Sequence, residues 1–215
     1  VVGLDYKMNI GHQGQLYGQF LLDEFVLKEI KAGRGWWGNK FGIQFGGKVI
    51  DLFDIKNLDI QGEVNVVRPF TYSHSDSIAN YTHYNQPLAH PLGANFSELI
   101  GIVRYQPKPK WTAQLKVIVF SQGVDTGSSN YGGNIFLLNS TRSLGDYGYT
   151  IANGVRANGL NASAWVGYEV VENLFIDASL MYRRYHAAAA TIQSRNSTMF
   201  TIGLRLNMFR REYDY

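Results

Sequence analysis

Hydrophobic and polar residues alternate with a period of two along most of the chain. The first segment places Val2, Leu4, Tyr6, Met8 and Ile10 between small or polar residues. Such alternation is typical of a β-strand, in which successive side chains point to opposite faces. The same pattern predicts about nine strands, of roughly the ten residues that a tilted strand needs to cross a bilayer. They are expected at 2–10, 16–26, 41–49, 58–66, 99–105, 111–119, 160–170, 174–182 and 200–208.

The links between these segments alternate in length. Short links are expected at 11–14, 54–57, 106–110 and 172–173, and long ones at 27–35, 71–97, 121–156 and 187–196. Short turns at one end and long loops at the other are the layout of outer-membrane β-barrels. This layout predicts that the long loops face outside the cell and the short turns face the periplasm.

The polar positions distinguish a membrane barrel from a soluble sandwich or a lipocalin-like barrel. Outward positions such as Leu58, Ile60, Leu204 and Leu206 alternate with positions that carry charge in the middle of strands, where a soluble core could not hold them. These charged positions are Asp5, Lys7, Asp59, Glu63, Lys116, Asp177 and Arg205. Aromatic residues also gather near the predicted strand ends, where they are expected to form interfacial girdles. They are Trp36, Trp37, Phe70, Tyr72, Tyr105, Trp111 and Phe209.

The predicted fold is therefore all-β: one antiparallel transmembrane β-barrel domain over residues 1–215, located in the bacterial outer membrane in contact with its lipid. Bacterial single-chain barrels have an even number of strands. An odd count of nine predicts that this segment is the C-terminal part of a larger barrel, from which a signal peptide and upstream strands are missing.

Composition supports the β assignment and excludes several functions. The chain has 23 glycines and 14 tyrosines, and only 17% of its residues are charged. It has no cysteine, so thiolate chemistry, cysteine-ligated metals and disulfides are excluded. A net charge of +3 without a basic stripe gives no sign of nucleic-acid binding. No apolar run approaches the length of a transmembrane helix.

The loop at 71–97 contains three of the five histidines, His74, His83 and His90, together with Asp76. Imidazoles and a carboxylate are suitable ligands for zinc or copper, but their spacing matches no compact metal motif. A Ser/His hydrolase, by analogy with outer-membrane lipases, is another interpretation. It would need a serine, a histidine and an orienting polar group brought together, and the sequence contains no nucleophile-elbow motif. The favoured interpretation is an ordered surface loop without metal, cofactor or catalytic residues, and the chain is not expected to be an enzyme.

Two other loops offer ligand-binding surfaces. Trp36 and Trp37 could stack on sugars, although an interfacial girdle is the favoured interpretation. The segment 128–134 is rich in Ser, Asn and Gly, and is expected to be a flexible outside loop. The candidate contacts to an extracellular ligand are Trp36, Trp37, Tyr72, His74, His83, Tyr84 and His90.

Three segments resemble outer-membrane proteins of the Bacteroidota. They are residues 80–96 (NYTHYNQPLAHPLGANF), 18–25 (GQFLLDEF) and 35–40 (GWWGNK). The resemblance covers roughly residues 16–209 and is to the Wzi-like capsule-assembly family and to gliding-motility proteins of the RemB kind. It implies a barrel of about eighteen strands that retains capsular polysaccharide on the cell surface, of which this chain would form half. No catalytic or sugar-contacting residue is carried over from the family.

The expected function is non-catalytic binding or anchoring of a surface polysaccharide. One alternative is a structural subunit of a secretion, gliding or nutrient-uptake complex, with outer-membrane protein partners. A second alternative is an outer-membrane hydrolase.

Overall fold

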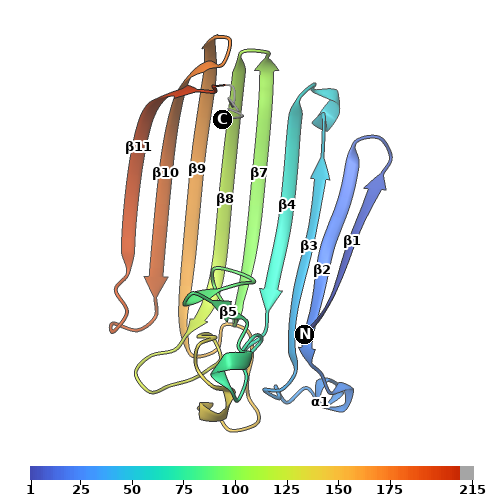
Figure 1. Ribbon diagram of the computed structural model, residues 1–215, viewed down its shortest axis with the longest axis vertical. Coiled ribbons are helices and arrows are strands. Elements are labelled where there is room, and N and C mark those ends of the chain that lie inside the picture. Colours follow the sequence, from blue (N-terminus) through green and yellow to red (C-terminus); the bar gives the residue numbers. More distant parts are fainter. Residues whose placement is uncertain (209–215) are drawn as a thin grey trace, which may run out of the picture.

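The computed structural model describes residues 1–208, which form one antiparallel sheet of nine strands (Figure 1). Each strand of this main sheet pairs with the next one along the chain, so the all-β antiparallel prediction and the strand count are confirmed. In spatial order the strands are β1 (Val2–Ile10), β2 (Gly14–Glu24), β3 (Lys40–Val49), β4 (Leu58–Val67), β7 (Phe96–Lys108), β8 (Trp111–Val124), β9 (Val155–Val171), β10 (Leu174–Ala187) and β11 (Arg195–Leu206).

The main sheet is open. Within residues 1–208, β1 pairs only with β2 and β11 pairs only with β10, so both outer edges have free backbone groups. These residues therefore do not close a barrel by themselves.

The main sheet has one apolar and one polar face. Leu4, Phe20 and Ile43 lie opposite one another across β1, β2 and β3, and all three are exposed. The next row of the opposite face contains Asp5, Gln19 and Gln44. The predicted alternation of faces is correct in the seven strands whose sequences show it, and large apolar side chains are uncovered along the whole apolar face. Examples are Phe45, Val64, Leu99, Leu115, Val119, Leu180, Ile202 and Leu204.

The long and short links lie at opposite ends of the main sheet (Figure 1). The short turns occupy 11–13, 50–57, 109–110 and 172–173, and the long loops occupy 25–39, 68–95 and 125–154. The fourth predicted long loop is shorter than expected, at 188–194, because β10 and β11 extend toward each other. β9 also starts at Val155 rather than at residue 160. Ala157 and Asn158 already pair with β8, although their sequence shows no alternation of apolar and polar residues.

The long loops contain small elements of their own. They include the helix α1 (Leu27–Ala32), which ends at Gly33 in a left-handed conformation, and a hairpin of β5 (Thr82–His83) and β6 (Gln86–Pro87). Short 3-10 turns occur at Ser77–Ala79 and Asn139–Thr141 in these loops, and at Leu52–Asp54 in a short turn. No helix within residues 1–208 is both long enough and apolar enough to span a membrane.

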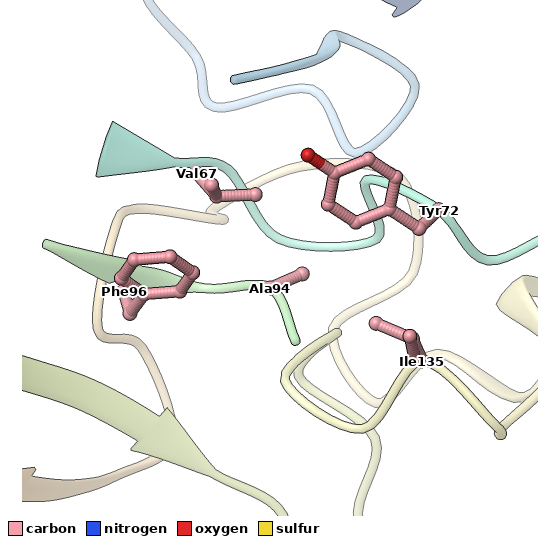
Figure 2. Packing of buried hydrophobic residues seen from close by; sticks show 5 residues of the cluster. All are labelled: Val67, Tyr72, Ala94, Phe96 and Ile135. Atoms are coloured by element: carbon pink, nitrogen blue, oxygen red, sulfur yellow. The ribbon is translucent and has the colours of Figure 1, made fainter. Parts of the chain in front are cut away.

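The hydrophobic core lies in the long loops, at one end of the main sheet. Figure 2 shows Val67, Tyr72, Ala94, Phe96 and Ile135 packed together, which joins loops 68–95 and 125–154 to the ends of β4 and β7. Phe70 is also fully buried, with its ring 4.9 Å edge-on from that of Tyr149. Full burial of an aromatic side chain of this size contributes about 1.5–3 kcal/mol.

This core corrects two expectations. Phe70 and Tyr72 are not interfacial girdle residues, because the loops bury them; Tyr105 and Trp111 do lie half-exposed at the turn end of the main sheet. Phe209 lies outside the described residues. The segment 128–134 is not an open flexible loop either: Asn130 is buried, and the Asp125 carboxylate accepts hydrogen bonds from the backbone of Tyr131, Gly133 and Asn134.

Candidate functional site

A pocket of about 310 Å³ lies on the polar face of the main sheet, beneath the loop 68–95. We call it the polar-face pocket. The strands supply the floor and the loop supplies the roof. Its lining side chains come from β2 (Gln19, Leu21), β3 (Gln44), β4 (Asn65, Val67), β7 (Phe96) and the loop (Tyr72, Tyr81, Ala89, His90).

Aromatic rings form two walls of this pocket. The rings of Tyr72 and Tyr81 stack with their centres 5.8 Å apart, and those of His90 and Phe96 stack at 4.4 Å. Tyr72 has a positive φ of 78°, which is uncommon for a residue other than glycine. Burial raises the pKa of Tyr72 to about 12, and the nearby Tyr81 and Asp23 add to the effect. The Tyr72 hydroxyl therefore stays neutral at physiological pH.

The floor is a row of amide side chains in register across three strands. Gln19 lies opposite Gln44, which lies opposite Asn65. Their amide nitrogens donate to neighbouring carboxylates: Gln19 to Asp5, Gln44 to Glu63, and Asn65 to both Glu63 and Glu98, at 2.7–3.0 Å. Their amide oxygens accept no hydrogen bond within residues 1–208, so they are available to donors of a ligand.

His90 belongs to this network. Its Nε2 lies 3.2 Å from Oε2 of Glu98, the carboxylate that also accepts from Asn65. The contact holds the imidazole ring against the Phe96 ring in the pocket wall. His90 therefore positions the pocket wall.

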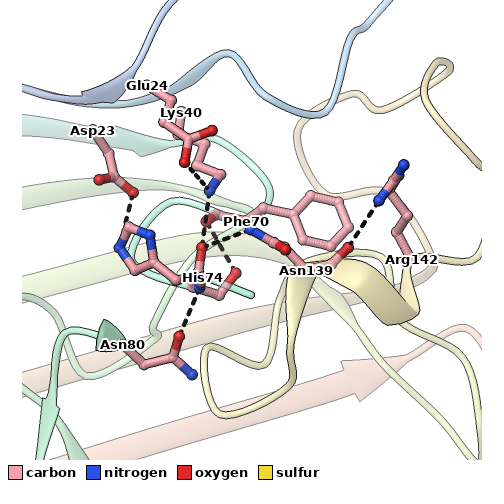
Figure 3. A network of polar contacts seen from close by, with 9 residues as sticks. Asp23, Glu24, Lys40, Phe70, His74, Asn80, Asn139 and Arg142 are labelled. Carbon is pink, nitrogen blue, oxygen red and sulfur yellow. Dashed lines mark hydrogen bonds and ion pairs between the residues drawn. The ribbon is translucent and has the colours of Figure 1, made fainter. Parts of the chain in front are cut away.

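A second network anchors the loop 68–95 to the strand ends (Figure 3). The Lys40 ammonium, which is fully buried, contacts Oε1 of Glu24 at 3.1 Å and the backbone oxygen of Ser73 at 2.9 Å. Beside it, His74 Nε2 lies 3.7 Å from Oδ2 of Asp23, whose side chain is only 2% exposed. These contacts hold Tyr72 in place, because they fix the two residues that follow it.

The structure separates the seven candidate residues into four groups. Tyr72 and His90 line the polar-face pocket, and His74 anchors the loop above it. His83 and Tyr84 lie at the tip of the β5–β6 hairpin, where Tyr84 is 89% exposed. Trp36 and Trp37 lie apart from the pocket, next to α1. Trp36 lines a different cavity, and Trp37 packs edge-on against Phe70.

The three loop histidines are also dispersed. Each one contacts a different group: Asp23, Tyr84 or Glu98. Across residues 1–208, no group of three or more histidine, aspartate or glutamate side chains is close enough to hold a metal ion.

Sequence reasoning missed Gln19, Gln44, Asn65 and Tyr81. The three amides lie within predicted strands, on the polar face of the main sheet. Their alignment in one row depends on strand register, which the periodicity of a single strand does not give. Tyr81 was one aromatic among several in a long loop, without a pattern to distinguish it.

No family model, curated protein or solved structure matches this chain.

Proposed function

We propose that this chain is part of an outer-membrane β-barrel that binds a surface polysaccharide, such as a capsule, without catalysing a reaction. The observation that carries the membrane proposal is the uncovered apolar face of the main sheet. A contiguous apolar surface of this extent is rare on a soluble protein and needs lipid or protein to cover it. Charged rows on the opposite face, and loops gathered at one end, support the same arrangement.

The polar-face pocket supports the saccharide proposal. Sugars present apolar C–H faces and many hydroxyl groups, so they are bound by flat aromatic rings together with fixed amide and hydroxyl groups. The Tyr72–Tyr81 wall and the row of Gln19, Gln44 and Asn65 supply both kinds of contact. Among the described residues 1–208, no lysine or arginine lines the pocket, so an uncharged sugar residue fits it better than a uronic acid or a sulfated sugar.

Binding to an array of bacterial polysaccharides tests this proposal. Protein purified in detergent is compared with Tyr81→Ala and Gln44→Ala, and Tyr84→Ala serves as the control because Tyr84 is an exposed aromatic outside the pocket. Loss of an aromatic stacking partner costs about 0.5–1.5 kcal/mol, which is a two- to tenfold loss of affinity. An equal loss in the Tyr84 variant, or no bound glycan, would contradict the saccharide proposal.

A structural subunit of a surface complex is the second candidate function. The observation that favours it is the hairpin tip, where Tyr84 projects into solvent with its ring 4.2 Å from that of His83. Exposed aromatics of this kind are enriched at protein interfaces. Isolation of the native complex with wild-type protein and with Tyr84→Ala distinguishes the two functions: a complex lost only in the variant would favour a subunit role.

A further inference from the structure

A second cavity, of about 450 Å³, lies at the loop end of the main sheet, between loop 25–39 and the segment 148–150. We call it the rim cavity. Phe41 and Arg68 line it, and the backbone N–H of Arg68 donates to the oxygen of Phe41 at 3.0 Å. The two residues continue the apolar face, because they lie two positions beyond the paired Ile43 and Val66. The rim cavity is therefore on the opposite side of the main sheet from the polar-face pocket.

Arg68 brings a positive charge to this cavity, with its guanidinium carbon 5.8 Å from the centre of the Phe41 ring. Its Nε donates to the backbone oxygen of Asn39 at 2.8 Å, and its Nη2 donates to those of Trp36 at 3.2 Å and Tyr149 at 3.4 Å. Within residues 1–208, its Nη1 donates no hydrogen bond and no carboxylate lies within 4 Å of it. Burial lowers the pKa of the Arg68 guanidinium, but an arginine side chain in a protein stays protonated. Such a charge is stabilised by an anion that supplies the missing partner.

The other ionic groups of the cavity leave this charge in place. Arg34 and Glu29 also line the cavity, and they pair with each other at 3.0 Å between Nη2 and Oε2. Arg34 also stacks over the ring of Tyr147, 4.2 Å from its centre. Two arginines and one glutamate sum to one net positive charge, which is that of Arg68.

The surroundings of the rim cavity indicate which kind of anion would reach it. The Phe41 ring lies 6.4 Å from the ring of Phe20, and the exposed Ile43 and Phe45 continue the apolar surface along β3. A molecule with its anionic head at Arg68 can therefore lay an apolar tail on these side chains. A free anion would gain nothing from that surface.

We infer that the rim cavity binds the phosphate group of an anionic membrane lipid, with Arg68 as its charge partner and the lipid tail on Phe41, Phe20 and Ile43. The inference rests on the proposed membrane insertion for the source of the lipid. The phosphate would accept from Nη1 of Arg68 in charge-assisted hydrogen bonds. Trp36, on the wall of the same cavity, suits the headgroup level of a bilayer because its ring has an apolar body and a polar N–H.

Three ligands test the assignment by titration calorimetry with protein purified in a non-ionic detergent. They are dihexanoyl phosphatidate, the zwitterionic dihexanoyl phosphatidylcholine and inorganic phosphate. The phosphatidate is expected to bind at least tenfold more tightly than either of the others. Inorganic phosphate binding as tightly as the phosphatidate would overturn the lipid assignment, and equal binding of the two lipids would overturn the anion site.

Two variants change the site in opposite directions. Arg68→Gln is expected to weaken phosphatidate binding at least tenfold, because it removes a charge-assisted hydrogen bond. Arg68 also holds three loop carbonyls, so this loss alone could reflect a loosened loop. Glu29→Gln removes the one acidic side chain that lines the cavity. Because this carboxylate no longer repels the phosphate, phosphatidate binding is expected to tighten about threefold or more, and the gain should shrink at high salt. Arg104→Gln, on the polar face, is the control and should bind as the wild type does. Unchanged affinity in both Arg68→Gln and Glu29→Gln would overturn the site.

Flotation with phosphatidylcholine vesicles separates this inference from the proposed function. Protein that floats with vesicles but does not prefer phosphatidate contradicts the rim-cavity site alone. Protein that binds phosphatidate in detergent but does not float contradicts membrane insertion, and with it the lipid as natural source.

Discussion

Leu180 and Ser179 are neighbours on β10 that point to opposite faces at the same depth of the main sheet. Leu180 lies on the apolar face between Ala164 and Phe200, and Ser179 lies on the polar face between Trp165 and Thr201. Both are near the middle of a 14-residue strand. Replacing each in turn by arginine therefore changes only the face on which the charge is placed.

The two substitutions should differ by about 2–4 kcal/mol, the penalty for arginine on the lipid face of a barrel near the bilayer midplane. Leu180 is already 49% exposed in the protein alone, so loss of its protein contacts accounts for only about 1 kcal/mol of this. Under the proposed membrane insertion, the remainder comes from placing the guanidinium in hydrocarbon. Ser179→Arg should cost less than about 1 kcal/mol, because the polar face holds charges such as the Asp177–Arg205 pair nearby.

Urea unfolding of the protein in phospholipid vesicles, followed by tryptophan fluorescence, measures both free energies. Equal penalties would refute the assignment of the apolar face to lipid. So would a Leu180→Arg variant as stable as the wild type, since that is the behaviour of a leucine exposed to water. The two variants are matched controls for each other, because they differ in the face that carries the charge and not in its depth.

Three further predictions concern the loops. The neutral Tyr72 hydroxyl should contribute up to about 2–3 kcal/mol to folding stability below pH 10. This contribution should be lost as the pH rises toward 12, because the pKa of Tyr72 is raised to about 12 in the folded protein. Tyrosinate absorbance should show this late titration, and Tyr72→Phe should remove it. Asn95→Ala should lower the free energy of local unfolding of loop 125–154 by about 2–4 kcal/mol, because the buried amide donates to the backbone oxygens of Gly123, Tyr131 and Asn153. Faster proteolysis within that loop, with an intact sheet, is the readout. In intact cells an impermeant thiol reagent should label Ser128→Cys, in a long loop, but not Glu172→Cys, in a short turn; the reverse pattern would invert the proposed orientation.

The strands were predictable because period-two alternation reflects the two faces of the main sheet directly. Val2–Ile10 and Leu58–Val67 have this pattern, and the structure has strands there. The start of β9 was not predictable, because Val155–Gly159 carries no alternation and is a strand only through its pairing with Phe120–Val124. Neighbouring strands, rather than local sequence, determine that segment.

The loop core was beyond sequence reasoning for a different reason. Phe70 lies next to a strand end, where an aromatic is typical of an interfacial girdle. It is buried because loop 125–154 folds back over it and brings Tyr149 and the backbone of Gly132 into contact. Tyr72 and His90, which the sequence offered as candidate contacts, line the pocket through contacts of loop 68–95. Their arrangement with Gln44 and Asn65 required the register.

For the proposed barrel, the strand directions of the two open edges restrict how further strands could close the main sheet. With nine alternating strands, β1 and β11 both run from the loop end to the turn end. An antiparallel closure must therefore insert an odd number of strands, of which the first and the last run from turn end to loop end. A second copy of these nine strands in the same orientation would meet both edges with strands of the same direction, forming two parallel seams. Nine strands of the opposite phase would instead give an even, fully antiparallel ring, as in bacterial single-chain barrels.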